Sequence, residues 1–191
     1  SISHTLNAGF NNFNFSSGRI FLTNLSFNFV KDQIVSNVIP LKNQNGQTSG
    51  AQLTRPENVQ GYYNANLFFT YSRPFKNRKY VISTLGFVNY NNNINLVDGL
   101  KNTGRNVLYN QGLTFEYNIK WLEITTGVRY NLNYADFSLT TSPTTRQSTW
   151  TLSNEARVDF GKGFILRWDF DYLLNQGLAE GVQQNIALLN G

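Results

Sequence analysis

The sequence contains no cysteine and only one histidine, His4. The lack of cysteine excludes disulfide frameworks, thiolate metal sites and cysteine nucleophiles. A single imidazole cannot form a histidine-based metal cluster. We therefore expect no metal site and no cofactor.

Charged residues and long apolar runs are also scarce. Charged residues make up 14% of the chain, whereas a typical globular domain has about 25%. The sequence has no apolar run that approaches the roughly 20 residues of a transmembrane helix, and its mean hydropathy is -0.35. Helical membrane spans are excluded, but strands that present alternate residues to lipid and to water also average near neutral. So little charge indicates that something other than water covers much of the surface.

Amides and aromatic rings dominate what is present. Asn occurs 28 times among the 191 residues, aromatic residues reach 15%, and the net charge is +5. The positive charges are scattered along the chain, which argues against nucleic acid as a partner. They fit contact with anionic lipid headgroups or with an anionic solute.

Apolar and polar residues alternate with a period of two, most clearly over residues 121–139. Leu122, Ile124 and Val128 alternate with Glu123 and Arg129. This pattern predicts a β-strand with one apolar and one polar face. The segment is longer than the mean globular strand of about 5–6 residues and is long enough for a tilted membrane-spanning strand.

The alternation recurs over residues 21–29, 63–72, 105–120, 148–160 and 164–174. Residues 80–96 are also extended, but their two faces are not separated, so their orientation stays open. Tyr, Trp and Phe suit a membrane–water boundary, because the ring lies in the dry region and the polar atom stays wet. The rings predicted to face lipid are Phe27, Phe29, Phe69, Tyr71, Phe115, Tyr117, Tyr130, Tyr134, Trp150, Trp168, Phe170 and Tyr172.

The opposite faces of these segments carry charges. An Arg or Lys facing lipid at mid-bilayer costs about 2–4 kcal/mol, so this face must contact water or protein. The charges predicted to face a lumen are Glu116, Glu123, Arg129, Glu155, Arg157, Asp159, Arg167, Asp169 and Asp171.

These charges have two interpretations: they tune passage through a polar lumen, or they pair across strands and hold the wall together. We favour pairing. It predicts that Asp159 lies opposite Arg167, and Arg157 opposite Asp169, across the turn at residues 161–163. A register that pairs Arg157 with Arg167 would contradict this inference.

The links between strands alternate in length. Short turns are predicted at residues 16–18, 74–79, 120–121 and 161–163, and long polar loops at 37–60, 97–104, 140–147 and 175–183. Pro40, Pro56 and Pro143 fall in the long loops, where no ladder hydrogen bond is lost. Tight turns that alternate with long loops are typical of an outer-membrane meander. We expect an all-β, antiparallel, up-and-down transmembrane barrel region over residues 1–191, with eight strands, a ninth beginning near Asn185, and no helix.

Three other features could carry chemistry. His4 near Ser1 and Ser3 is the one candidate for nucleophilic catalysis, but no second histidine accompanies it, and a strand residue is the favoured interpretation. Asp169 and Asp171 share a face and could hold Ca²⁺, although no oxygen-rich loop accompanies them. Residues 89–95 are rich in Asn and could bind sugars, although a solvated strand end is the commoner meaning.

The stretches NVQGYYNANLFFTYSRPF, YNQGLTFEYNIKWLEITTGVRYNLNYADFSL and GKGFILRWDFDYLLNQGLAEGVQQNIALLNG resemble the outer-membrane β-barrel family of TonB-dependent receptor-like proteins. The opening SISHTLNAGFNNF is similar to the strand that precedes them in that family. The resemblance covers essentially the whole chain. It implies a barrel of about 22 strands with a plug, energised from the inner membrane. The plug, the segment that engages the energising complex and the closing strand are missing from this sequence, so we expect a fragment or processed piece of a longer chain.

The expected function is therefore the barrel wall of a transporter that takes a nutrient or other solute across the outer membrane of a double-membraned bacterium. Its expected partners are outer-membrane lipid and, in the full-length protein, a plug domain and the inner-membrane energising complex. One alternative is a small closed barrel with a structural or adhesive role, in which the first and last strands pair. A barrel enzyme that depends on His4 is the third class, and we expect no enzymatic activity.

Overall fold

The computed structural model describes residues 1–43, 45–139, 144–178 and 184–190. Within these residues the chain forms eleven β-strands and no helix, so no helix is available to cross a membrane. The expectation of an all-β, antiparallel fold is confirmed. The strands are β1 (Ile2–Asn14), β2 (Arg19–Lys31), β3 (Gln33–Lys42), β4 (Thr48–Val59), β5 (Tyr62–Phe75), β6 (Tyr80–Val97), β7 (Leu100–Ile119), β8 (Leu122–Phe137), β9 (Thr145–Gly161), β10 (Phe164–Gln176) and β11 (Asn185–Asn190).

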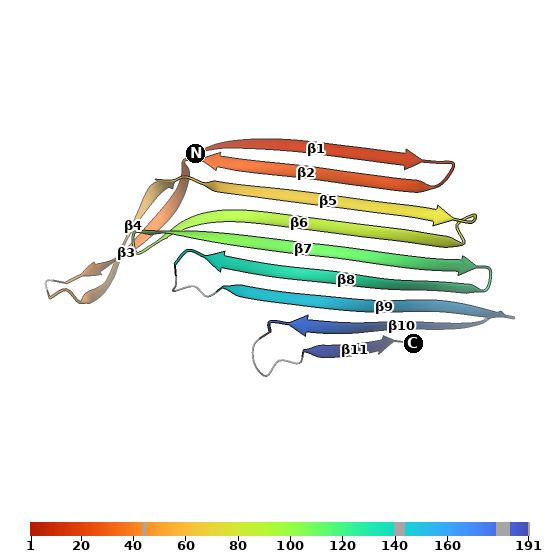
Figure 1. Cartoon of the computed structure of the whole chain (residues 1–191). Coiled ribbons are helices and arrows are strands. Elements are labelled where there is room, and N and C mark those ends of the chain that lie inside the picture. The colour runs from red at the N-terminus through yellow and green to blue at the C-terminus, as the bar shows by residue number, and fades with distance from the viewer. Residues whose placement is uncertain (44, 140–143, 179–183, 191) are drawn as a thin grey trace.

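Nine of these strands form one antiparallel sheet in the order β1-β2-β5-β6-β7-β8-β9-β10-β11. Strands β3 and β4 form a separate hairpin at one end of this sheet (Figure 1). Consecutive strands are neighbours except where this hairpin is inserted between β2 and β5. In the described part of the chain, β1 and β11 each pair with one strand and not with each other. The sheet is therefore open, without the pairing of first and last strands that a small closed barrel requires.

The register divides the side chains between two faces along the whole sheet. Tyr117 lies opposite Tyr80, and Tyr130 opposite Trp150. All twelve rings predicted to share a face do so, and we call this side the aromatic face. The other side, which carries most of the amides and all nine charges predicted to share a face, is called the polar face.

The orientation of β6, which the sequence left open, follows from its neighbours. Ser83 and Asn89 lie opposite Thr114 and Leu108 on the polar face, whereas Ile82 and Val88 lie on the aromatic face. Leu85 and Phe87 are on the polar face and Thr84 is on the aromatic face. This mixture explains why the period-two pattern was unclear in this strand.

The large sheet is a single layer without a core. The only buried apolar side chains among the described residues are Val59, Ile94 and Ala156. The exposed surface is 13080 Å² for 21.8 kDa, whereas a soluble globular protein of this mass exposes about 9,300 Å². The aromatic rings contact rings on neighbouring strands, such as Tyr63 with Tyr90 at 5.6 Å and Tyr130 with Trp150 at 4.6 Å, rather than a second sheet.

Two of the expected long loops are wrong. Residues 37–60 lie mostly in the β3–β4 hairpin, so Pro40 and Pro56 are strand residues opposite Gln52 and Ser36. Each strand of a two-stranded sheet keeps one open edge, where proline costs no ladder hydrogen bond. A proline in a strand pattern therefore indicated an edge here rather than a loop.

Residues 97–104 form a tight turn with continuing strands. Asp98 and Gly99 have φ values of 52° and 77°, and Val97 pairs with Leu100. Two consecutive positive φ angles define a type I′ turn, for which Asp-Gly is a preferred pair. The expected loops at 140–147 and 175–183 fall partly outside the described residues, as does Pro143. The four short turns are confirmed.

A buried amide joins the hairpin to the sheet. Asn37 is 1% exposed; its Nδ2 donates to Glu57 Oε1 at 2.7 Å, and its Oδ1 accepts from the Gly99 backbone N–H at 3.2 Å. Lys101 Nζ also donates to the Gln60 carbonyl. The hydrogen bonds from Asn37 and then from Arg55 hold the pKa of the Glu57 carboxyl below its ordinary value of 4.5.

We expect Asn37→Ala to loosen the hairpin at a cost of about 0.5–1.5 kcal/mol, because it removes the hydrogen-bond partner of the Gly99 N–H and of the Glu57 carboxylate. Hydrogen–deuterium exchange of residues 33–59 should rise, while the large sheet stays protected. The exposed Asn58→Ala is the matched control and should change little.

The same contact should depend on pH. A carboxyl whose pKa is lowered in the folded state contributes its full stability above its ordinary pKa, and this contribution is lost as pH falls through the lowered value. Acidification below pH 4.5 should therefore loosen the hairpin in the native chain but not in Glu57→Gln. Equal pH responses in both proteins would contradict the role assigned to Glu57.

Candidate functional site on the polar face

Amide side chains bridge neighbouring strands across the middle and the hairpin end of the polar face. Asn89 donates to Asn66 and Asn66 donates to Asn64, which links β6 to β5. Asn110 donates to Asn131 between β7 and β8. Cross-strand pairs of this kind satisfy polar groups without a core. From the Asn-rich stretch 89–95, Asn89 therefore has a structural role.

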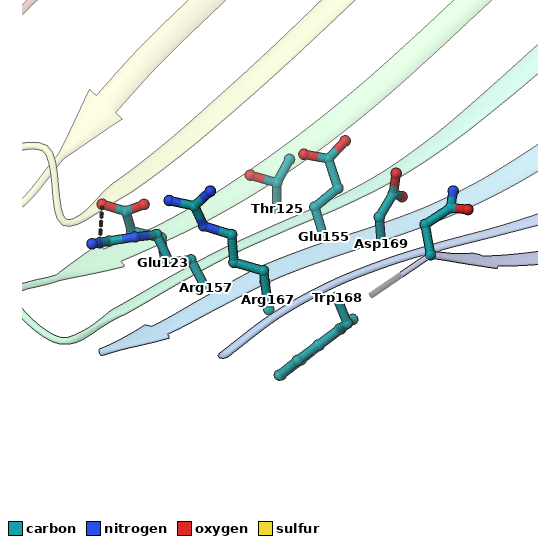
Figure 2. Close-up of a pocket in the computed structure, with 9 residues that line it drawn as sticks. Glu123, Thr125, Glu155, Arg157, Arg167, Trp168 and Asp169 are labelled. Carbon is teal, nitrogen blue, oxygen red and sulfur yellow. Dashed lines mark ion pairs between the residues drawn. The ribbon is translucent and has the colours of Figure 1, made fainter. Parts of the chain in front are cut away.

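The charges gather near the opposite end, around a hollow of about 420 Å³ between β8, β9, β10 and β11. Figure 2 shows the charged side chains of these strands projecting to one side, while Trp168 points to the other. Residues that line the hollow include Glu123, Thr125, Glu155, Arg157, Arg167 and Asp169.

Arg157 makes both ion pairs at this hollow among the described residues. Its guanidinium lies 3.7 Å from Glu123 Oε1 on β8 and 3.6 Å from Asp159 Oδ2 on β9. The side chains are 32%, 54% and 35% exposed, respectively. Partly exposed pairs at such distances contribute about 0–1 kcal/mol each. They help to orient the side chains more than they stabilise the sheet.

The predicted charge register is wrong. Arg157 lies opposite Arg167, and Glu155 lies opposite Asp169. Asp159 lies opposite Ile165, with a register shift next to Phe164. Gly161, Lys162 and Gly163 all have positive φ, and Gly161 pairs directly with Phe164. The expected charge pairing would need a longer loop than the one observed. The tight turn, with the register shift beside it, therefore places Arg157 opposite Arg167 and Glu155 opposite Asp169.

The nine predicted charges are nevertheless all on the polar face. Five of them line the hollow, and Asp159 is bound to Arg157. The other three lie apart: Glu116 is opposite Thr125, Arg129 opposite Thr151, and Asp171 opposite Ser153. The interpretation that opposite charges pair across strands thus holds for Glu123 with Arg157 and fails between β9 and β10.

The catalytic candidate at the N-terminal strand is not assembled. His4 lies opposite Phe29, on the aromatic face. Ser3 projects to the polar face, where its Oγ donates to Asn28 Oδ1 at 2.7 Å. Successive side chains of a strand point to opposite faces, so this pair cannot act together.

The candidate Ca²⁺ site also lacks ligands. In the parts of the chain that the structure describes, no group of three or more His, Asp or Glu side chains could hold a metal ion. Asp169 and Asp171 share the polar face as predicted, opposite Glu155 and Ser153.

Sequence reasoning missed the polar groups on the aromatic face. Gln111 Nε2 donates to Thr84 Oγ1 at 2.6 Å. Trp168 Nε1 donates to Asn154 Oδ1 at 2.9 Å, and Asn154 Nδ2 donates to Thr126 Oγ1 at 2.8 Å. Polar groups in an apolar medium need internal partners. The available signal was their position in the alternation: each occupies a place that the pattern assigns to the apolar side.

Comparison with family models, characterised proteins and solved structures gives no match for this chain.

The absence of native cysteine allows the β9–β10 register to be tested directly. We expect Arg157→Cys combined with Arg167→Cys to form a disulfide under mild oxidation, because residues directly opposite in a sheet have Cα atoms close enough for the bond. Asp159→Cys with Arg167→Cys is the control and should form a disulfide much more slowly. Cross-linking would be measured as a gel-mobility shift that reverses on reduction, and a faster reaction of the control pair would restore the register predicted from charge.

Proposed function

We propose that this chain is part of the wall of an outer-membrane β-barrel of the TonB-dependent receptor-like kind, through which a nutrient or other solute crosses the outer membrane. The single observation that carries the proposal is the exposed aromatic face of a one-layer sheet. In water, so large an apolar face would mark an interaction site or an aggregation hazard. Lipid covers such a face without a second protein layer.

The dimensions support this interpretation. Strands β5, β6, β7 and β8 contain 14, 18, 20 and 16 residues, whereas about 9–11 residues suffice for a tilted transmembrane strand. At about 3.3 Å per residue, the shortest of these is ~46 Å long, and an outer-membrane barrel carries an apolar band about 25 Å tall. The strands are long enough to span this band and extend beyond it.

The distribution of polar groups supports it as well. Charges on the aromatic face lie toward the strand ends, as do Arg73, Arg105, Asp136 and Arg146. The polar groups Gln111, Asn154 and Trp168 on that face have hydrogen-bond partners. Unsatisfied groups in hydrocarbon cost several kcal/mol each. In this arrangement the polar face lines a water-filled lumen along the path of the solute.

The open edges at β1 and β11 bear on how the wall is completed. A sheet edge in hydrocarbon leaves a row of backbone groups without partners. We therefore propose that further strands close the wall, as in the larger barrels that the sequence resembles. The same resemblance supports a plug and an energising complex as partners of the full-length protein.

Neighbouring single-cysteine variants test the assignment of the two faces. With the chain reconstituted in phosphatidylcholine vesicles, we expect Arg129→Cys and Asn131→Cys on the polar face to react with a water-soluble maleimide. Val128→Cys and Leu132→Cys, one residue away on the aromatic face, should be protected because acyl chains cover them.

All four variants should label equally after denaturation in SDS, which controls for intrinsic reactivity. Equal labelling of both faces in vesicles would overturn the membrane proposal. A chain that stays monodisperse in plain buffer, with its aromatic face accessible, would overturn it as well.

A further inference from the structure

We propose that the turn end of the sheet binds the headgroups of anionic phospholipids; the inference rests on the proposed membrane function. The turn end is defined by the four links between β1 and β2, β5 and β6, β7 and β8, and β9 and β10. These links lie together at the end of the sheet opposite the β3–β4 hairpin (Figure 1).

The charges within the four links have one sign. The four links contain Lys76, Arg78, Lys79, Lys120 and Lys162 and no Asp or Glu. At the hairpin end, by contrast, the links include Asp32 and Asp98, and Arg55 is paired with Glu57 at 2.6 Å. The fold thus gathers cations from distant links at one end of the sheet, where the neighbouring carboxylates of Glu123 and Asp159 are already paired with Arg157. An anionic surface would attract these cations by about 1 kcal/mol for each Lys or Arg close to the membrane.

Several of these cations lie over aromatic rings. Lys79 Nζ is 5.7 Å from the Tyr80 ring centroid and 5.4 Å from that of Tyr117. Lys76 Nζ lies 5.8 Å from Tyr80, and Arg73 Cζ lies 4.8 Å from the Phe75 ring. Cations over rings place positive charge where the aromatic face ends. This is the level of the headgroups if the aromatic face contacts acyl chains.

A small hollow at the same end combines two guanidinium groups with aromatic rings. It has a volume of about 180 Å³ and lies between the β1–β2 link and the β5–β6 link. Arg19 and Arg78 line it together with Phe13, Phe15 and Ile20. In the described part of the chain, neither arginine has a carboxylate within 4.0 Å. Guanidinium groups bind phosphate oxygens well, and the apolar lining suits the adjoining acyl chain.

Exposed rings at this end favour a lipid over an acidic protein or a nucleic acid. Phe15 is 95% exposed, Trp121 55% and Phe164 67%. A site for a purely polar polyanion does not need bare rings among its cations. An amphiphile that carries both a phosphate and hydrocarbon chains matches both parts.

The test uses the full chain and vesicles of two compositions. In flotation assays, we expect binding to phosphatidylcholine vesicles to strengthen when phosphatidylglycerol is mixed in. The double variant Arg19→Gln with Arg78→Gln should reduce this gain by about fivefold for each cation removed, or ~25-fold for the pair. High salt should weaken the gain further.

The matched control is Lys31→Gln with Lys42→Gln, which removes the same charge from exposed positions at the hairpin end. It should keep the gain from phosphatidylglycerol. Lys76→Gln with Lys79→Gln supplies a second turn-end pair in case the first variant does not fold. Native far-ultraviolet circular dichroism is required of each variant.

The outcomes separate this inference from the proposed function. A chain that floats equally well with both vesicle types would overturn the headgroup site but leave the membrane role in place. A chain that floats with neither would overturn both. If the turn-end and hairpin-end variants lose the phosphatidylglycerol-dependent binding equally, net charge alone explains the effect, and the proposed site is overturned. Binding of polyglutamate with the same dependence on Arg19 and Arg78 would assign the surface to an acidic protein instead.

Discussion

The hydrogen-bonded ladder between neighbouring strands is the interaction on which the rest of this structure depends. Globular proteins owe most of their stability to burial of apolar side chains, but this sheet has almost none buried. Its nine strands are joined along long, regular registers, such as that of β6 and β7 from Tyr80–Tyr117 to Val97–Leu100. Backbone hydrogen bonds are strongest where water is absent. In the membrane location proposed above, lipid would take the place of the missing core.

Regular pairing also explains why most side chains sort by polarity between the two faces. Once a turn and any register shift beside it fix one pair of residues, the later pairs in that hairpin are set, and alternate side chains fall on fixed faces. The Asp98-Gly99 and Lys162-Gly163 turns, with positive φ at both positions, act in this way. The charges adapt to the register that results. Arg157 faces Arg167 across β9 and β10 and finds its carboxylates on β8 and on its own strand.

The two ends of the sheet differ in chemistry as well as in shape. One end carries the β3–β4 hairpin, which is joined to the sheet by the buried Asn37 amide and bears charges of both signs. The other carries tight turns with cations and exposed rings. Long extensions on one side and short turns on the other are typical of outer-membrane barrels. The charge asymmetry adds a reason why the turn end would lie against anionic headgroups.

The sequence by itself determined the strand class, most strand positions and the face of each predicted ring and charge, because period-two alternation is a local property that each segment carries alone. It also indicated the four short turns. It could not determine which charges oppose one another, because register depends on the turn and on the register shift beside Phe164. The predicted and observed registers of β9 and β10 differ by two residues, and such a difference leaves the alternation of the two faces unchanged. The sequence led to a wrong prediction for residues 37–60, because Pro40 and Pro56 are excluded from central strands but not from a two-stranded hairpin.

Only the tertiary structure brought Asn37 to Gly99, and Arg19 to Arg78. The residues of each pair are distant in sequence and meet only when the strands between them are paired.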